Sequence, residues 1–201
     1  MILFEYGKAT DILPICTACA HRSQGELESA AARAALERLY AEARERGTSL
    51  PREMPKVERE AGGKPCFADR CAEFSLSHDG GYVFAALSTD ARIGIDLVSL
   101  EREISRPSAV AARFFTEGER RALPCESSIE YREAFLRTWA RKEAAVKLTG
   151  EGAAALARTD TSRDNARSLS KAEAPSAGRA LFEGEVRIGG KRFFAAIYIE
   201  K

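Results

Sequence analysis

Two apolar segments, each preceded by a Gly-Gly pair, are the feature that most limits how this chain can fold. Gly80-Gly81 precedes the apolar residues 82–87, and Gly189-Gly190 precedes a similar segment at 193–197 with one residue inserted. Another apolar run comes before each pair, at 74–77 and 180–186, so each pair predicts the turn of a β-hairpin. The recurrence suggests two similar halves. Apolar hairpins share this composition in any case, so the match alone does not establish a repeat.

Helix signals lie between and before these hairpins. Capping-box patterns begin at Ser23, Thr116 and Ser127, and Pro107 marks another helix start. The first predicts a helix ending near Gly47, and the third predicts the strongest helix, over residues 128–149. Short strands are expected over 1–6 and 92–98, with the first hairpin turn at 78–81. Residues 48–65 are expected to form a loop, and 151–180 a mobile insertion or loop.

Composition excludes several classes of protein. The chain has 201 residues, enough for one large domain or two small ones, and a net charge of +1, which argues against a general nucleic-acid binder. No segment approaches the ~20 apolar residues that span a bilayer, and we expect no signal peptide at the N-terminus.

The odd number of cysteines, five, favours free thiols in a reducing cytoplasm. Cys16 and Cys19 lack the partners of a zinc or haem site, so we interpret them as small apolar side chains.

Asp96 is the first candidate for chemistry. It interrupts the predicted strand 92–98, where Ile93, Ile95 and Leu97 would face the core. Asp96 would then project from the opposite face, beside Gly94, which would leave space for a ligand. An aspartate that faces water at a strand end is an equally good interpretation of this segment alone.

The second candidate is a stripe on the predicted helix 128–149. Phe135, Trp139, Glu143 and Lys147 recur at intervals of four, so they share one face that begins apolar and ends charged. The charged pair, Glu143 and Lys147, would lie at the rim of the core, although a solvated surface Glu–Lys pair is the simpler interpretation of the helix alone. With Asp96, the stripe indicates a magnesium–phosphate site, because Mg²⁺ takes one or two protein carboxylates together with substrate phosphates. Lys147 would neutralise a phosphate oxygen.

Four sets of motifs, in order along the chain, give a resemblance to a known family. They are Gly63-Lys64-Pro65, similar to the family's G-K-P; residues 74–78, similar to F-N-x-S-H; residues 93–96, similar to (I/V)-G-(I/V)-D; and residues 114–119 with 139–147, similar to F-F-x-x-x-E and W-x-x-K-E-A-x-x-K. The chain resembles the 4′-phosphopantetheinyl transferases of the two-halved, Sfp-like type. The motifs cover residues 63–150, and their order is far more specific than any one of them.

The resemblance implies an α+β fold of two similar subdomains related by a pseudo-two-fold axis. Each would be an antiparallel sheet packed on a long helix. The N-terminal half, residues 1–90, would contact the nucleotide end of the substrate. The C-terminal half, residues 91–201, would carry the metal and catalytic residues.

The resemblance also implies the activity and its partners. The chain would move the phosphopantetheine arm of coenzyme A onto a serine of an apo acyl or peptidyl carrier protein, with Mg²⁺, and release adenosine 3′,5′-bisphosphate. It would act as a cytoplasmic monomer, with no nucleic-acid or membrane partner. Basic residues such as Arg113, Arg120 and Arg121 would help an acidic carrier protein dock, unless they only form a solvated face.

Site roles follow from the matched motifs. Asp96 and Glu143 would hold Mg²⁺ and Lys147 would contact the phosphates, with these three as the catalytic residues. The nucleotide end would meet a set of cofactor-binding residues: Lys64, Pro65, Ser77, His78 and, by a looser alignment, Arg22. Lys142 would be a further contact with coenzyme A. Glu143 would take the serine proton, directly or through metal-bound water. Glu119 is the rival base, but its position in a capping box already explains it.

Two departures from the family pattern leave alternatives open. Val98 stands where many relatives have a second acid, which leaves the metal two protein carboxylates. Asp79 follows His78 and would repel a phosphate unless it is turned away. The alternatives are a non-catalytic module that binds coenzyme A or a carrier protein, and an unrelated Mg²⁺-dependent phosphohydrolase.

Overall fold

The computed structural model describes residues 1–13 and 23–201. The strands in the described part are β1 (Ile2–Lys8), β2 (Val57–Arg59), β3 (Pro65–Phe67), β4 (Glu73–Asp79), β5 (Tyr82–Ser88), β6 (Arg92–Ser99), β7 (Ala166–Ser168), β8 (Arg179–Ile188) and β9 (Lys191–Glu200). The α-helices are α1 (Ala9–Ile12), α2 (Gln24–Glu45), α3 (Pro107–Phe114), α4 (Glu117–Ala122) and α5 (Tyr131–Thr149), and two 3₁₀ turns are η1 (Ala153–Ala155) and η2 (Leu169–Lys171). The fold is therefore mixed α/β.

The strands form two larger sheets and one short pair. The first sheet has the order β1-β5-β4, the second has the order β6-β9-β8-β7, and β2 pairs with β3. All of these pairings are antiparallel except that of β7 with β8. In each larger sheet, the strand that precedes the long helix pairs with the last strand of the hairpin that follows it.

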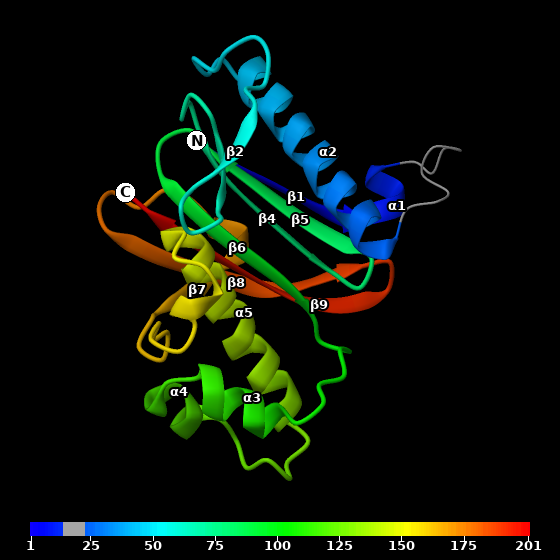
Figure 1. The fold of residues 1–201 in the computed structure, drawn as a ribbon, viewed down its shortest axis with the longest axis vertical. Coiled ribbons are helices and arrows are strands. Elements are labelled where there is room, and N and C mark those ends of the chain that lie inside the picture. The colour runs from blue at the N-terminus through cyan, green and yellow to red at the C-terminus, as the bar shows by residue number, and fades with distance from the viewer. Residues whose placement is uncertain (14–22) are drawn as a thin grey trace.

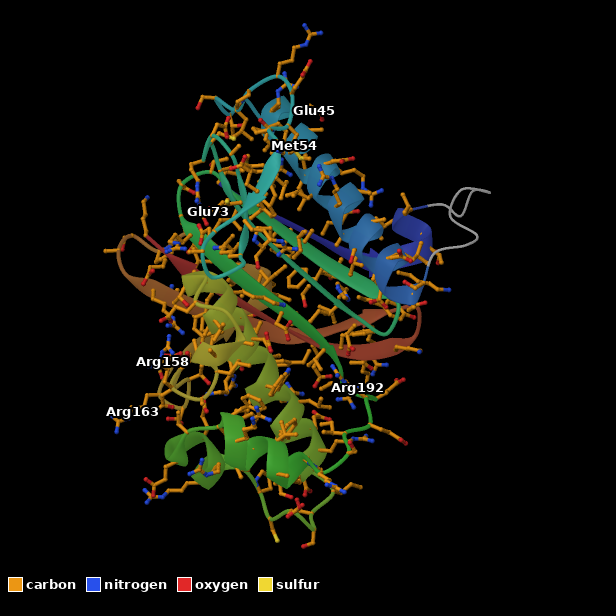
Figure 2. The ribbon with its side chains drawn as sticks, in the orientation of Figure 1. Glu45, Met54, Glu73, Arg158, Arg163 and Arg192 are labelled. Atoms are coloured by element: carbon orange, nitrogen blue, oxygen red, sulfur yellow. The ribbon has the colours of Figure 1, made fainter. Side chains whose placement is uncertain are left out.

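The core is layered as helix, sheet, sheet and helix. Alternate residues of β5 explain how: Val83 and Ala85 pack with α2, whereas Phe84 and Ala86 pack with β6, β8 and β9. The far face of the second sheet packs against α5, as Figure 1 shows. Charged side chains such as those of Glu45 and Arg163 point away from these layers (Figure 2).

A row of side chains on β4 joins the two sheets. The hydroxyl oxygens of Ser75 and Ser77 accept the backbone N–H groups of Ile95 and Leu97 at 3.1 and 3.2 Å. Asp79 accepts the N–H of Ser99 at 2.7 Å, which continues the same register. Polar side chains thus replace the missing backbone ladder between β4 and β6 and satisfy buried N–H groups that would be costly to leave unpaired.

Most of the expected elements are confirmed, and the capping signals explain where the helices start. Ser23 and Thr116 both form complete capping boxes, at the start of α2 and α4, and Pro107 occupies the first turn of α3. Helix α5 ends at Gly150, whose φ of 76° is the left-handed conformation that a C-terminal cap requires. The predicted strands 1–6 and 92–98 and the C-terminal hairpin are also present.

Four local predictions are wrong. The first hairpin turns at Gly80-Gly81 alone, so His78 and Asp79 belong to β4. The expected loop 48–65 contains β2, and the expected loop 151–180 contains β7. Helix α5 begins at Tyr131 without a side-chain cap, because the Ser128 N–H donates to the carbonyl oxygen of Cys125 in a preceding turn.

Gly94 is the point where β6 touches α5, and this contact gives a testable prediction. A Cβ atom there would lie 2.2 Å from both Ala144 O and Leu148 N, which are backbone atoms of α5. We expect Gly94→Ala to lower the free energy of unfolding by about 3 kcal/mol, measured by urea denaturation, because the helix must move. Gly25→Ala is the control: a Cβ meets nothing within 4 Å there, so it should raise stability by about 0.5–1 kcal/mol. Equal stability of Gly94→Ala and wild type would contradict this packing.

Candidate active site

Asp96 lies in the middle of β6, on the face that the strand alternation predicts. Ile93, Ile95 and Leu97 enter the core between the sheets, whereas Asp96 faces the side of α5. The expected open space beside Gly94 is wrong, because the backbone of α5 fills it. The ligand side of Asp96 must therefore be the side on which Glu143 and Lys147 of α5 lie.

Two donors hold the carboxylate of Asp96. Ser77 Oγ donates to Oδ1 at 2.6 Å, and Lys147 Nζ donates to the same oxygen at 2.7 Å. Asp96 is 7% exposed, so these bonds stabilise a charge that burial alone would disfavour. Within residues 1–13 and 23–201, no hydrogen bond reaches Asp96 Oδ2.

Glu143 lies one helical turn before Lys147 and faces the same side of α5. Burial raises the pKa of the Glu143 carboxyl, the negative charge of Asp96 raises it further, and Lys147 opposes both. In the part of the chain that the structure describes, the Glu143 carboxylate has no hydrogen-bond donor. The predicted stripe is confirmed: Phe135 and Trp139 stack in the core, and the charged pair lies at its rim.

The raised pKa of Glu143 predicts a pH-dependent loss of stability. A carboxyl whose pKa is higher in the folded state binds its proton more tightly there, so wild type loses stability as pH rises from about 4.3 through that raised value. We expect Glu143→Gln to be more stable than wild type at pH 7 and equal to it below about pH 4. Urea denaturation at both pH values measures this, with the exposed Glu45→Gln as control. A variant that is no more stable at pH 7 would contradict the desolvation of Glu143.

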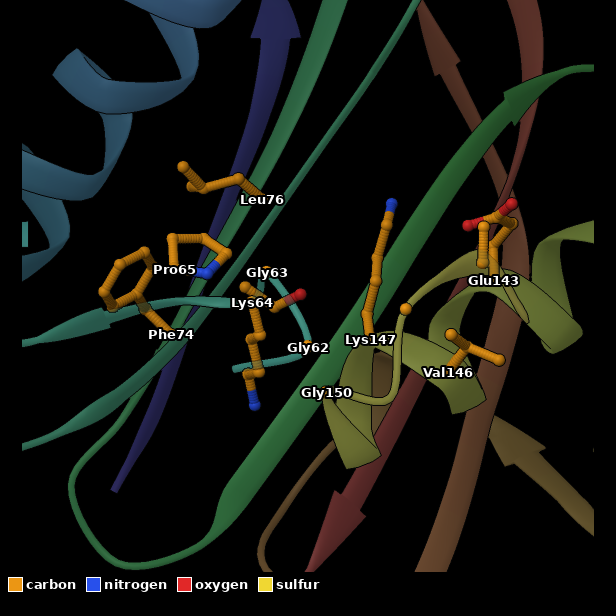
Figure 3. A pocket seen from close by; sticks show the side chains of 13 residues that line it. Gly62, Gly63, Lys64, Pro65, Phe74, Leu76, Glu143, Val146, Lys147 and Gly150 are labelled. Carbon is orange, nitrogen blue, oxygen red and sulfur yellow. The ribbon is translucent and has the colours of Figure 1, made fainter. Parts of the chain in front are cut away.

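Glu143 and Lys147 line a pocket of about 240 Å³ opposite the 62–65 loop. Gly63 and Pro65 form part of the facing wall, and Phe74 continues it along β4. Figure 3 shows the polar ends of Lys147 and Glu143 on one side and the side chains of Pro65 and Leu76 on the other. The structure therefore brings together the predicted residues Asp96, Glu143, Lys147 and Pro65.

Lys64 borders this pocket, but its ammonium group is engaged elsewhere. Nζ donates to Glu73 Oε2 at 3.0 Å, to Ile93 O at 3.2 Å and to Leu148 O at 3.4 Å. The side chain points away from Lys147 in Figure 3. Lys64 thus ties the loop to β4, β6 and the C-terminal end of α5, and its contact with a nucleotide stays a prediction.

Side chains alternate along β4, so Ser77 and Asp79 face β6 and His78 faces the opposite side. The Ser77 hydroxyl is buried between Asp96 and the Leu97 N–H, so here it orients the carboxylate. His78 faces the opposite way, with its side chain 43% exposed. Asp79 is turned toward Ser99 and Arg102; burial raises the pKa of its carboxyl, and these two donors oppose that shift. The acid is therefore directed away from the side that His78 faces.

Lys142 is not brought to the pocket. Its side chain is fully buried, and Nζ donates to Glu119 Oε2 at 2.6 Å and to Thr159 O. The predicted contact of Lys142 with coenzyme A therefore finds no support in this arrangement. Glu119 completes the capping box of α4 and also binds Thr161, which agrees with its structural explanation.

Val98 and Arg22 complete the predicted positions. Val98 is 1% exposed and packs in the core under α5, so the site has two carboxylates and not three. Residues 1–13 and 23–201 contain no cluster of three or more His, Cys, Asp or Glu side chains that could hold a metal. Arg22, Cys16 and Cys19 lie outside the described residues.

The chemistry of the donor set fits Mg²⁺. The carboxylates of Asp96 and Glu143 lie close enough for the charge of one to raise the pKa of the other, and each has an oxygen without a hydrogen bond in the described part of the chain. Glu143 also lines the pocket. Mg²⁺ takes one or two protein carboxylates and fills its other positions with water and phosphate oxygens. Asp96 and Glu143 are the residues that would hold it.

Sequence reasoning missed three residues around His78. Glu28 of α2 binds the His78 imidazole at 2.7 Å. Arg33 and Arg59 line a groove of about 590 Å³ with His78, and this groove shares Pro65, Phe74 and Leu76 with the pocket above. No motif marks these three residues. The nearest signal is a pair of charged residues one turn apart on the exposed side of the first long helix, Arg33 and Glu37, which points to Arg33 alone of the three.

Part of the chain is similar to a known family of proteins. Residues 92–188, which include Asp96, Glu143 and Lys147, match the model of the 4′-phosphopantetheinyl transferase superfamily. The 4′-phosphopantetheinyl transferase HetI of Nostoc sp. is 38% identical over 105 residues, 50% of this chain and 44% of that protein. The 4′-phosphopantetheinyl transferase psf-1 of Bacillus pumilus is 35% identical over 105 residues, 52% of this chain and 43% of that protein.

A third relative matches a longer segment. The 4′-phosphopantetheinyl transferase AcpT of Salmonella typhimurium is 31% identical over 125 residues, 60% of this chain and 62% of that protein. The matched segments thus span between about two fifths and two thirds of these relatives. None of the described helices is long and apolar enough to cross a bilayer. Over residues 92–188 the chain therefore carries a domain of the 4′-phosphopantetheinyl transferase superfamily.

Proposed function

We propose that this protein transfers the 4′-phosphopantetheine arm of coenzyme A to a serine of an apo acyl or peptidyl carrier protein. The observation that carries the proposal is the convergence of Asp96, Glu143 and Lys147 beside one pocket, within the segment that matches the superfamily. Paired carboxylates and a lysine are suited to a pyrophosphate and its metal. A phosphohydrolase would use the same groups, so the acceptor decides between them.

The proposed step is a displacement at the β-phosphate of coenzyme A. The serine oxygen forms a new bond to this phosphorus, and the bond between the phosphorus and the bridging pyrophosphate oxygen breaks. Adenosine 3′,5′-bisphosphate leaves with the electron pair. Glu143 takes the serine proton, and its raised pKa makes it a better base than an exposed glutamate. Lys147 moves from Asp96 to the phosphate oxygens. Bound Mg²⁺ would stabilise the negative charge on these oxygens.

We further propose that the two halves, residues 1–90 and 91–201, are related by a pseudo-two-fold axis. Each half has the order strand, long helix, hairpin: β1, α2, β4-β5 in the first and β6, α5, β8-β9 in the second. The sheet orders β1-β5-β4 and β6-β9-β8 correspond strand by strand, and both hairpins turn at a Gly-Gly pair. This correspondence supports the two-halved type.

The nucleotide end of coenzyme A would lie in the groove lined by Arg33, Arg59 and His78. Three basic side chains over an apolar floor suit an adenine ring with a 3′-phosphate. The groove adjoins the pocket at Pro65, so the pyrophosphate would reach Lys147 while the pantetheine arm extends past Glu143.

The proposal includes a monomer in the cytoplasm that binds neither nucleic acid nor membrane. A second half within the chain takes the place of a partner subunit, which supports the monomer. The free thiols of Cys66, Cys71 and Cys125 suit a reducing compartment.

Incubation with coenzyme A, Mg²⁺ and an apo carrier protein tests the function. A gain of one phosphopantetheine on the carrier, detected by mass spectrometry, is expected. Coenzyme A that binds without transfer would indicate the non-catalytic module instead. Hydrolysis of coenzyme A without a carrier would indicate a phosphohydrolase.

A further inference from the structure

Glu28 is a buried acid of α2 that no part of the proposed reaction uses. It is 6% exposed, and its carboxylate Oε1 accepts the Gly81 N–H at 2.6 Å and Gln24 Nε2 at 2.8 Å. Its other oxygen lies 2.7 Å from His78 Nδ1. The donors come from α2, β4 and the hairpin turn, so the position of this carboxylate is closely fixed.

The contact with Nδ1 decides which imidazole nitrogen is free. A carboxylate accepts, so Nδ1 must carry a hydrogen, and the other nitrogen, Nε2, is left to face a ligand. Phosphate oxygens also accept, so Nε2 bonds a phosphate when the ring is the imidazolium, in which both nitrogens carry a hydrogen. His78 lines the groove with Arg33 and Arg59. In free histidine the ring turns and exchanges its proton between the two nitrogens, whereas here Glu28 permits one arrangement.

We infer that Glu28 is a positioning residue: it binds Nδ1–H of His78 and turns Nε2 toward this groove, where the Nε2–H of the imidazolium donates to a phosphate oxygen. The inference rests on the proposed function, in which that group is the 3′-phosphate of coenzyme A. In metal sites, similar carboxylates orient the histidine ligands. Loss of such a carboxylate lowers the affinity for the metal about tenfold or more.

Imidazole nitrogen NMR tests the arrangement without any assay of activity. The chain has only two histidines, so His21→Gln leaves the ring signals of His78 alone. In that background we expect neutral His78 to carry its hydrogen on Nδ1, and Glu28→Gln to shift the hydrogen toward Nε2. Glu37→Gln, a change on the same helix at an acid that pairs with Arg33, should leave the signals unchanged. A hydrogen on Nε2 in the protein with native Glu28 would overturn the inference.

Ligands with and without the 3′-phosphate test recognition. Glu28→Gln should weaken binding of adenosine 3′,5′-bisphosphate about tenfold, as the loss of one charge-assisted hydrogen bond predicts, and leave adenosine 5′-phosphate unchanged. The KM for coenzyme A should rise about tenfold at constant kcat, whereas transfer from dephospho-coenzyme A should not change. His78→Gln should give the same pattern, and the double variant should lose no more.

The outcomes separate this inference from the proposed function. Equal losses with both donors would show that Glu28 only supports the fold, and would overturn the inference while transfer itself stands. Wild-type protein that transfers from neither donor would overturn the proposed function, whatever the NMR shows about His78. A thermal melt of Glu28→Gln checks that this variant is folded. Glu28→Asp is a second variant, which keeps the charge but is too short to reach Nδ1, and it should give the same loss.

Discussion

Glu143→Gln is expected to lower kcat for phosphopantetheine transfer by about 10²–10⁴-fold, the usual contribution of a positioned general base. The amide keeps the size of the side chain but cannot accept the serine proton and is a poor ligand for Mg²⁺. Steady-state transfer to an apo carrier protein at saturating Mg²⁺ measures the effect. Because the same change is expected to stabilise the fold at pH 7, loss of activity could not be blamed on unfolding.

Glu130→Gln is the matched control for this prediction. Glu130 is exposed at the N-terminal end of α5, thirteen residues before Glu143 and therefore about 20 Å away along the helix. The same chemical change there should leave kcat unaltered. Near-normal turnover of Glu143→Gln at saturating Mg²⁺ would show that Glu143 is neither the base nor a metal ligand. Asp96 and Lys147 would then have to support the reaction without it.

The sequence predicts a side chain's orientation correctly where that orientation depends on a single strand or helix. Strand alternation puts Asp96 on the face away from Ile93, Ile95 and Leu97, and the interval of four puts Glu143 and Lys147 on one side of α5. Both rules depend only on local geometry. The capping boxes at Ser23 and Thr116 belong to the same class, since each needs only four consecutive residues.

Contacts between distant segments could not be predicted from the sequence. Lys64 binds Leu148 O, 84 residues away, and Glu28 binds His78, 50 residues away in the sequence. No motif encodes such partners, so the sequence does not reveal the bonds that Lys64 and Ser77 make within the protein. Gly94 is the same kind of case: the missing side chain admits the backbone of α5, which sequence alone could not distinguish from space for a substrate.

Lys142 and Glu143 are neighbours in one motif, but they point to different sides of α5 and have different surroundings. Lys142 is adjacent to Glu143, so it points about 100° away around the helix and meets α4 instead of the pocket. Its partner Glu119 is 2% exposed and binds the Thr116 N–H, the Thr161 N–H and the Thr161 hydroxyl. One buried ion pair thereby joins α4, α5 and the segment around Thr159.

Lys142→Met is therefore expected to lower the free energy of unfolding by about 3–5 kcal/mol, because it leaves the Glu119 charge buried without its cation. For a chain of this length the melting temperature should fall by roughly 10 °C. The exposed Lys171→Met should have little effect. The double variant Lys142→Met with Glu119→Gln should recover part of the loss, since it removes both charges together, and a double-mutant cycle measures the coupling.

Kinetics of the same variant distinguish a structural Lys142 from one that binds the substrate. If Lys142 only fixes the packing of α5 on α4, Lys142→Met assayed well below its melting temperature should keep the KM for coenzyme A within about twofold of wild type, since surface and remote changes shift energies by less than about 0.5 kcal/mol. If its ammonium group reaches a phosphate, the KM should rise tenfold or more, as expected for a lost charged hydrogen bond. A stable Lys142→Met protein with a raised KM would restore the motif-based role and would require α4 to move when coenzyme A binds, because Lys142 is completely enclosed.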